Sequence, residues 1–343
     1  MNKTGIIYGV NGPVIYLKGD PGFKISEMVY VGPEKLVGEV IGLKKGMTTV
    51  QVFEETTGLK PGDTVMGTGD AISVLLGPGI IHNIFDGIQR PLEEIAKSSG
   101  KYISRGVSVD SLDTAKKWDV HVTVKVGDMV SAGTIIAETQ ETASILHKSM
   151  VPPTIGEAEV IKAVPDGAYT ILDPIVTVRL SDGSERDIAL AQKWPIRVPR
   201  PTYKRFPASV PLVTGQRILD TLFPIAKGGT AAIPGGFGTG KTMTQHAIAK
   251  WSDADLIVYI GCGERGNEMT EVLEDFSKLI DPKSGNPMMD RTVLIANTSN
   301  MPVAAREASI YTGLTLAEYY RDMGYHVAIM ADSTSRWAEA LRE

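Results

Sequence analysis

Eight residues in the second half of the chain match the phosphate-binding pattern G-x-x-x-x-G-K-[ST] at every fixed position. They are Gly235, Gly236, Phe237, Gly238, Thr239, Gly240, Lys241 and Thr242. Glycines in such a loop let successive backbone N–H groups point at phosphate oxygens. The pattern predicts that Lys241 places its charge on the β- and γ-phosphates and that the Thr242 hydroxyl ligates Mg²⁺. A helix expected over 243–251 would add its N-terminal amides to the same anion site.

Strand-like and helix-like segments alternate around this loop. Continuous apolar runs, of the kind buried on both faces of a parallel sheet, lie at 256–261, 291–296 and 326–331. A shorter strand is expected at 229–233, and helices are expected over 268–279 and 302–323. This alternation predicts a parallel α/β sheet with right-handed crossovers. It disfavours the alternative interpretation of the loop as a glycine-rich turn that binds nothing.

Two carboxylates fall near the ends of these strands, at the edge where parallel sheets bind ligands. Asp332 follows one apolar run, where it could hold the Mg²⁺ of a nucleotide or cap a helix that begins at Ser333. Glu264 follows another run among small residues. It could orient the water that attacks a γ-phosphate, or it could be a loop side chain paired with Arg265. The residues alone leave both pairs of alternatives open.

Beyond the loop, the chain resembles the catalytic A (alpha) subunit of the V/A-type rotary ATPases, in its bacterial and archaeal form. The resemblance covers essentially the whole chain and rests on several long motifs in the same order. Besides the loop, they are PLVTGQR (211–217), FPIAKGG (223–229), GCGERGNE (261–268), NTSNMP (297–302) and ADSTSRW (331–337).

The resemblance implies roles in catalysis, nucleotide binding and metal ligation, with ATP and ADP as substrates and Mg²⁺ as cofactor. The expected catalytic residues are Glu264, Lys241 and Arg265. The loop 235–242 and Arg336 would bind the nucleotide, and Thr242 and Asp332 would ligate the metal. Within these sets, Glu264 would be the catalytic carboxylate and Asp332 the Walker B acid. Arg265 and Arg336 would be supporting charges near the phosphates.

The resemblance also implies a multidomain fold with four segments. An N-terminal β-barrel is expected over 1–70, where short β-type runs alternate with Gly and Pro turns. A link with a helix at 84–97 and the first part of the nucleotide domain would occupy 71–113, and an inserted all-β bulge domain 114–193. A P-loop, RecA-like nucleotide-binding domain would occupy 194–343. Family members continue further, so we expect a C-terminally truncated fragment whose nucleotide domain is incomplete and whose sheet has an unprotected edge.

The implied function is that of the catalytic subunit of an ion-translocating ATPase or ATP synthase, coupled to H⁺ or Na⁺ transport. In such an enzyme the chain would alternate with B subunits in a hexameric ring, take an arginine finger from a B subunit and contact the central-stalk rotor. It would be cytoplasmic and linked to the membrane ion channel only through the assembled complex. The truncated chain alone is expected to be inactive.

Three alternatives stay open. Another ring motor, such as a helicase or export ATPase, would share the loop and Glu264 but lack the bulge insertion. A nucleotide-binding fragment without catalysis is the second. The third is a fused carrier domain, since 124–133 is similar to the entry of a biotinyl or lipoyl domain, with Lys148 as the candidate modified lysine.

Composition disfavours several other classes. A net charge of -5 argues against a nucleic-acid surface, no apolar run reaches the roughly 18 residues that span a bilayer, and the first residues lack the apolar core of a signal peptide. The single cysteine, Cys262, excludes an intrachain disulfide and fits a reducing cytosol. The histidines show no zinc-ligand spacing, and His246 is expected to pack or to be exposed.

Overall fold

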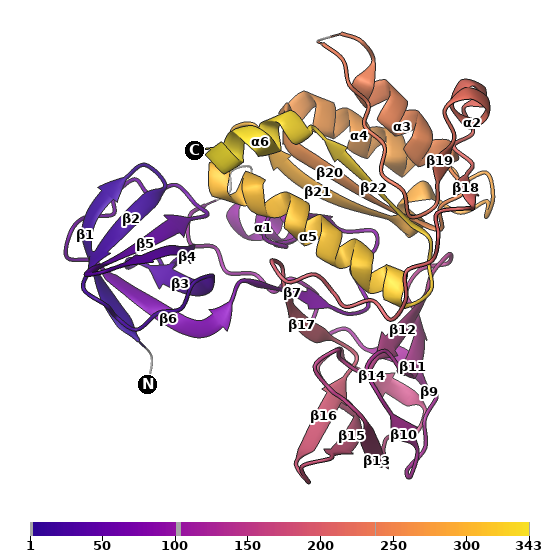
Figure 1. Cartoon of the computed structure of the whole chain (residues 1–343), viewed down its shortest axis with the longest axis horizontal. Coiled ribbons are helices and arrows are strands. Elements are labelled where there is room, and N and C mark those ends of the chain that lie inside the picture. The colour runs from indigo at the N-terminus through magenta and orange to yellow at the C-terminus, as the bar shows by residue number, and fades with distance from the viewer. Residues whose placement is uncertain (1–2, 101–103, 237, 343) are drawn as a thin grey trace.

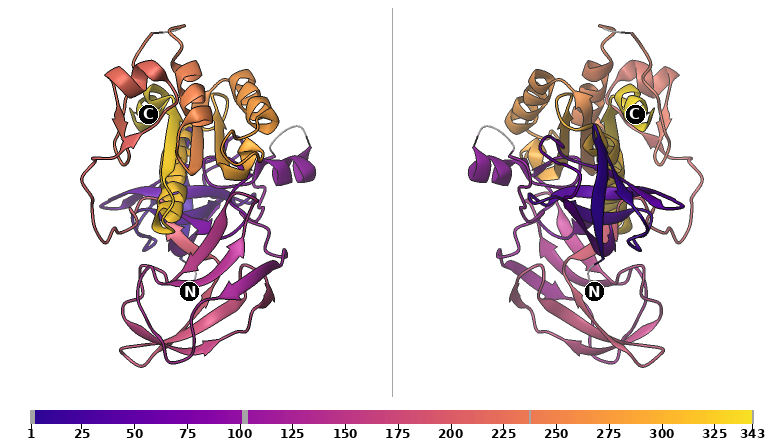
Figure 2. Two further views of the ribbon diagram at one scale, coloured as in Figure 1. Left: turned by 90° about the vertical axis from the view of Figure 1, so that its right-hand side faces the viewer. Right: turned by 90° about the vertical axis from the view of Figure 1, so that its left-hand side faces the viewer.

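A computed structural model describes residues 3–100, 104–236 and 238–342 and arranges them in three parts (Figure 1). An indigo β-barrel at the N-terminus lies to one side of an α/β part that carries the loop. An all-β sandwich extends away from the α/β part, as both side views of Figure 2 show. This arrangement confirms the expected combination of barrel, inserted all-β domain and parallel α/β sheet, whereas the expected boundaries at residues 70, 113 and 193 stay predictions.

The barrel is a closed antiparallel sheet with the strand order β1-β2-β5-β4-β3-β6. The strands are β1 (Thr4–Asn11), β2 (Val14–Lys18), β3 (Glu27–Val31), β4 (Leu36–Lys44), β5 (Met47–Val52) and β6 (Thr64–Ala71). Alternate residues of β2, β3 and β5 are buried, as the period of two in a strand requires. Their valine and isoleucine side chains fill the barrel with a core of its own.

The sandwich consists of two four-stranded antiparallel sheets. One has the order β10-β13-β15-β16 and the other β12-β11-β9-β14. Their bounds are β9 (Trp118–Val122), β10 (Met129–Val130), β11 (Ile135–Gln140), β12 (Leu146–Met150), β13 (Ala158–Ala163), β14 (Gly167–Tyr169), β15 (Pro174–Leu180) and β16 (Glu185–Ala189). Lys148 lies within β12, and its Nζ donates to the Met323 carbonyl at 3.3 Å. This position is unlike that of a carrier lysine at a hairpin tip, so the structure does not support the carrier alternative.

The α/β part is built on a parallel sheet with the order β22-β20-β21-β8. Its strands are β8 (Ile84–Phe85), β20 (Leu256–Glu264), β21 (Thr292–Thr298) and β22 (Val327–Asp332). Ile257 and Tyr259 pack with α3 (Lys241–Trp251) and α4 (Gly266–Lys278) on one face. Val258 and Ile260 pack with the long α5 (Val303–Asp322) on the other. Burial on both faces explains why β20 is an uninterrupted apolar run.

The remaining elements are short. They are β7 (Ser73–Leu76), α1 (Leu92–Ser99), β17 (Gln192–Pro195), β18 (Pro211–Leu212), α2 (Arg217–Leu222), β19 (Ile225–Ala226), the 3-10 turn Met288–Arg291 and α6 (Thr334–Arg342). Among the described residues, no helix is long and apolar enough to cross a membrane.

Two predicted elements are wrong. The segment 229–233 is not a strand, and most of it is exposed. It holds the weak strand formers glycine and alanine, and the described residues place no strand on the free edge of β22. The helix expected over 84–97 starts only at Leu92, because Asp86 Oδ1 accepts the backbone N–H groups of Ile88 and Arg90 in a turn that competes with helix formation.

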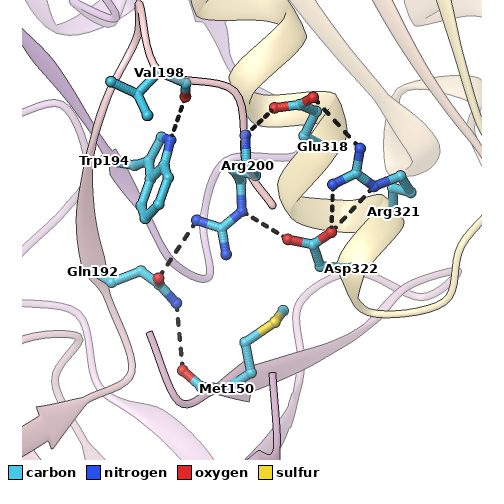
Figure 3. Close-up of polar contacts among 8 residues, drawn as sticks. All are labelled: Met150, Gln192, Trp194, Val198, Arg200, Glu318, Arg321 and Asp322. Carbon is cyan, nitrogen blue, oxygen red and sulfur yellow. Dashed lines mark hydrogen bonds and ion pairs between the residues drawn. The ribbon is translucent and has the colours of Figure 1, made fainter. Parts of the chain in front are cut away.

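A buried arginine ties the chain that leaves the sandwich to α5 (Figure 3). The Arg200 side chain is fully buried, and its Nε donates to Asp322 Oδ2 at 2.7 Å. Its backbone N–H donates to Glu318 Oε2 at 2.8 Å. The guanidinium lies 4.8 Å from the centre of the Trp194 ring and 5.3 Å from that of Tyr319. These contacts hold the strand end at β17 against the helix that backs the sheet.

Candidate functional site

A tight loop leads into the N-terminal end of α3. Gly240, the residue before the helix, has a φ of 83°, and Gly238 has a φ of 76°, a region that residues with a β-carbon adopt only with strain. Thr239 Oγ1 donates to the Gly236 carbonyl at 2.9 Å. Phe237, predicted as part of the loop, lies outside the described residues. Since α3 begins directly at the loop, the unpaired amides of its first turn can serve an anion.

Lys241 is the first residue of α3, and its side chain folds back over the loop. Its Nζ donates to the carbonyls of Gly235 at 2.7 Å and Gly236 at 2.9 Å. A β-carbon at Gly235 would collide with the Thr239 hydroxyl, so this turn needs glycine. The ammonium can exchange these neutral carbonyls for phosphate oxygens, because a full negative charge attracts it more strongly than a carbonyl dipole does.

The loop meets the sheet through Thr242 and Asp332. Thr242 Oγ1 donates to Asp332 Oδ2 at 2.6 Å, and Asp332 is buried at the carboxyl end of β22, opposite Gly261 of β20. Among the described residues, the Asp332 carboxylate bonds to α3 and β20 rather than to the first amides of α6. A hydroxyl beside a carboxylate offers the hard oxygen donors that Mg²⁺ prefers, with phosphates and water to complete its shell. The donor set therefore fits this metal.

Glu264 ends β20 after a local irregularity in the strand. Gly263 has a φ of 73°, and a β-carbon there would lie 2.9 Å from Arg336 Cβ. Glu264 is half-buried, and burial raises its pKa to about 7, together with a hydrogen bond that the protonated Glu264 donates to Glu268 and the negative charges of Asp332 and Glu268. Arg336 acts in the opposite direction. A carboxyl group with a pKa near neutrality is suited to handling protons or water at the operating pH.

The two arginines predicted as supporting charges come from different elements near the end of β20. Arg265 precedes α4, and its guanidinium is 3.9 Å from Glu268. Arg336 lies in α6 and donates to Glu339 at 2.9 Å. Both side chains are more than half exposed, so they can move toward an incoming anion. The structure thus brings all the predicted charges to one edge of the sheet.

Two residues of this site were missed in the sequence. The Tyr259 hydroxyl lies 3.5 Å from Asp332 Oδ2, and His246 Nε2 lies 3.1 Å from the Tyr259 hydroxyl. His246 is buried, as packing predicts, but it also has a polar partner. The spacing of these residues could have revealed them. His246 follows Thr242 by one helical turn, and Tyr259 precedes Gly261 on the same face of its strand.

The loop, the parallel sheet and the acid at its edge define the class of P-loop nucleotide-binding proteins. Three family models match the chain accordingly. The ATP synthase alpha/beta family nucleotide-binding domain matches residues 215–343, the barrel-sandwich domain of the alpha/beta subunits matches 109–197, and the β-barrel domain of the family matches 7–69.

Curated relatives narrow the family further. The chain is 61% identical over 343 residues to the V-type ATP synthase alpha chain of Halothermothrix orenii, covering 100% of this chain and 58% of the relative. It is 57% identical over 339 residues to the A subunit of the A-type ATP synthase of Methanopyrus kandleri, covering 99% of this chain and 57% of the relative. The chain belongs to the ATP synthase alpha/beta family, in the group of V-type alpha chains and A-type A subunits. It spans somewhat more than half the length of these relatives.

A solved structure shares the fold at low sequence identity. It is the assembled ATPase EscN from the type III secretion system of enteropathogenic E. coli, with a TM-score of 0.61 and 22% identity over 98% of this chain and 58% of that chain. At this identity the likeness concerns the architecture alone.

Proposed function

We propose that the chain forms the catalytic part of the A (alpha) subunit of a V/A-type ATP synthase, which hydrolyses or produces ATP coupled to H⁺ or Na⁺ transport. The observation that carries this proposal is the 2.6 Å contact between Thr242 and Asp332, which joins the phosphate loop to the carboxyl edge of the sheet. The half-buried Glu264 at the same edge supports a catalytic rather than a purely binding role. The names of the relatives point to the same function.

The loop and Lys241 would bind the phosphates of ATP or ADP. The amides of the loop and of the first turn of α3 supply hydrogen bonds, and the Lys241 ammonium supplies a positive charge. Thr242 and Asp332 would hold Mg²⁺, which when bound neutralises charge on the phosphate oxygens. Arg336 would add a further positive charge on the side of α6.

Glu264 would position the water that attacks the γ-phosphate in line with the leaving group. Its ionised carboxylate accepts a hydrogen bond from that water and increases the negative charge on the attacking oxygen. Lys241 and Arg265 would stabilise the charge that develops on the transferred group. Because Glu264 acts on the attacking water and not on the bound phosphates, its removal should lower the rate more than it lowers nucleotide affinity.

The whole protein would work within an assembly. A neighbouring B subunit would complete the site with an arginine finger, and a central-stalk rotor would couple the site to a membrane ion channel. The exposed Arg265 and Arg336 support a site that opens toward a partner. The assembly would place this chain in the cytoplasm at the membrane periphery.

Binding of a fluorescent ADP analogue to the full 343-residue chain tests the proposal directly. We expect saturable binding that Mg²⁺ strengthens, that ATP competes with and that is lost in Lys241→Ala. As a control, Lys250→Ala changes a lysine of the same helix that pairs with Asp275 at 2.8 Å, away from the loop. Binding that Lys250→Ala and Lys241→Ala impair equally would contradict the assignment of the site.

A further inference from the structure

One face of the sheet gathers four polar side chains from three elements. Thr242 and His246 lie one turn apart on α3 and therefore face the same way. Tyr259 lies on β20, where it is buried among the side chains that pack against α3 and α4. Asp332 ends β22, the neighbouring strand. The helix and both strands thus direct polar groups to one point beneath the phosphate loop.

These groups form a continuous chain of contacts. Asp332 Oδ2 accepts from Thr242 Oγ1 at 2.6 Å and lies 3.5 Å from the Tyr259 hydroxyl. The Tyr259 hydroxyl lies 3.1 Å from His246 Nε2. An ionised carboxylate can only accept hydrogen bonds, so the Tyr259 hydroxyl donates to Asp332 and is free to accept from an Nε2–H of His246.

We propose that Tyr259, held by His246, is a positioning residue that fixes the Asp332 carboxylate for metal binding. This inference rests on the proposed function, in which Thr242 and Asp332 hold Mg²⁺. Thr242 alone gives the carboxylate a single donor, which leaves the group free to turn about its last torsion. A second donor from the strand beside it removes that freedom.

Packing makes Tyr259 a rigid support. Its side chain is 1% exposed, and its ring meets Phe276 edge to face with centroids 6.0 Å apart and an interplanar angle of 86°. The centre of the His246 ring lies 5.5 Å from the centre of the Tyr259 ring. Burial lowers the pKa of His246, which agrees with a neutral ring that carries one proton for donation. A rigid ring with a fixed hydroxyl can orient a carboxylate at little entropic cost.

Groups that orient metal ligands from outside the coordination shell change metal affinity by about 10- to 100-fold when removed. Tyr259→Phe removes the hydroxyl and keeps the ring, so its effect should appear in metal binding rather than in folding. Tyr319→Phe is a matched control, because the Tyr319 hydroxyl is also buried and lies 3.1 Å from a histidine nitrogen, that of His147, among side chains of the other core.

The experiment titrates Mg²⁺ into the full chain in the presence of a fluorescent ADP analogue and repeats the nucleotide titration in EDTA. Tyr259→Phe should raise the apparent Mg²⁺ dissociation constant about tenfold and leave binding in EDTA unchanged. Tyr319→Phe should change neither. His246→Leu should act like Tyr259→Phe, and the double variant should lose no more than Tyr259→Phe, because the two residues act in series.

An apparent Mg²⁺ constant in Tyr259→Phe within twofold of the unsubstituted chain would overturn the inference, as would an equal loss in Tyr319→Phe. If the unsubstituted chain shows no Mg²⁺-dependent binding, the proposed function itself fails. The positioning role is then decided by a crystal structure of Tyr259→Phe. An Asp332 carboxylate that turns away from Thr242 supports it, and one that keeps its orientation and its contact with Thr242 overturns it.

Discussion

Thr242 and Asp332 meet over 2.6 Å although ninety positions separate them in the chain. The contact joins the first turn of α3 to the last residue of β22. Because both residues offer oxygen atoms and lie beside the loop amides, phosphate and metal can be bound at one place.

Lys241→Ala should abolish nucleotide turnover in the assembled enzyme. The ammonium is the positive charge that the loop itself brings to the phosphates, and loss of one such stabilising group lowers a rate by at least about 100-fold. Steady-state ATP hydrolysis measures the effect. Lys250→Ala, with its ion pair to Asp275 on the same helix, should retain normal turnover. Retained turnover in Lys241→Ala with an unaltered structure would refute the role of this lysine.

Glu264→Gln should keep nucleotide binding and lose hydrolysis. Glutamine has nearly the same size as glutamate, but it lacks the negative charge that polarises the attacking water. Loss of such a group costs about 10²- to 10⁴-fold in rate. Parallel measurements of ADP binding and kcat separate the two effects. If binding and hydrolysis fell by the same factor, Glu264 would be a binding residue and not the group that positions water.

The rate of ATP hydrolysis should rise with pH through about 7, because Glu264 must be ionised to accept a hydrogen bond from water and its pKa is raised to about 7. Glu268 raises that pKa through a hydrogen bond and its charge. Glu268→Gln should therefore lower the pKa of Glu264 and move the rising limb of the pH–rate profile to lower pH.

A matched control for this prediction is Glu271→Gln, which removes an exposed carboxylate from the same helix. It should leave the rising limb in place. A limb that stays at the same pH in Glu268→Gln would show that another group controls the profile.

Arg200→Ala should destabilise the contact between the sandwich and α5. The substitution removes the fully buried partner of Asp322 at 2.7 Å and leaves this carboxylate with Arg321 alone, also at 2.7 Å. Loss of a hydrogen bond to a charged group costs about 1.5 to 3 kcal/mol. Urea unfolding of the full chain measures the change. Lys97→Ala, which removes one side of the exposed pair with Glu94, should leave the unfolding curve nearly unchanged. Equal curves for the two variants would contradict a structural role for Arg200.

The parts of the fold that follow from local sequence could be predicted. The apolar runs that become β20 and β21 are buried on both faces, so composition alone marks them as strands. The similar run that becomes β22 is also a strand, although it lies at the edge of the sheet and Ile329 is exposed. The loop glycines and Lys241 are recognisable because their chemistry depends on residues adjacent in sequence. Asp332 and Glu264 could be placed at the same edge, since each follows a parallel strand.

Features that depend on distant pairing could not be predicted. Ile84 and Phe85 form a strand only because they pair with Leu294 and Ile295 of β21, and their local sequence gives no sign of that pairing. The contact of Tyr259 with Asp332 requires the register of β20 against β22. The raised pKa of Glu264 likewise depends on burial and on a neighbour from the following helix.

Mg·ATP hydrolysis by the purified 343-residue chain, measured with and without its candidate B subunit, decides whether the loop, Thr242 and Asp332 form a working nucleotide site. We predict that the chain alone binds Mg·ATP without turnover and that turnover begins when the B subunit supplies the missing arginine. Absence of both binding and turnover with the B subunit present would contradict the account, because the loop, Thr242 and Asp332 would then not form a working nucleotide site in this chain.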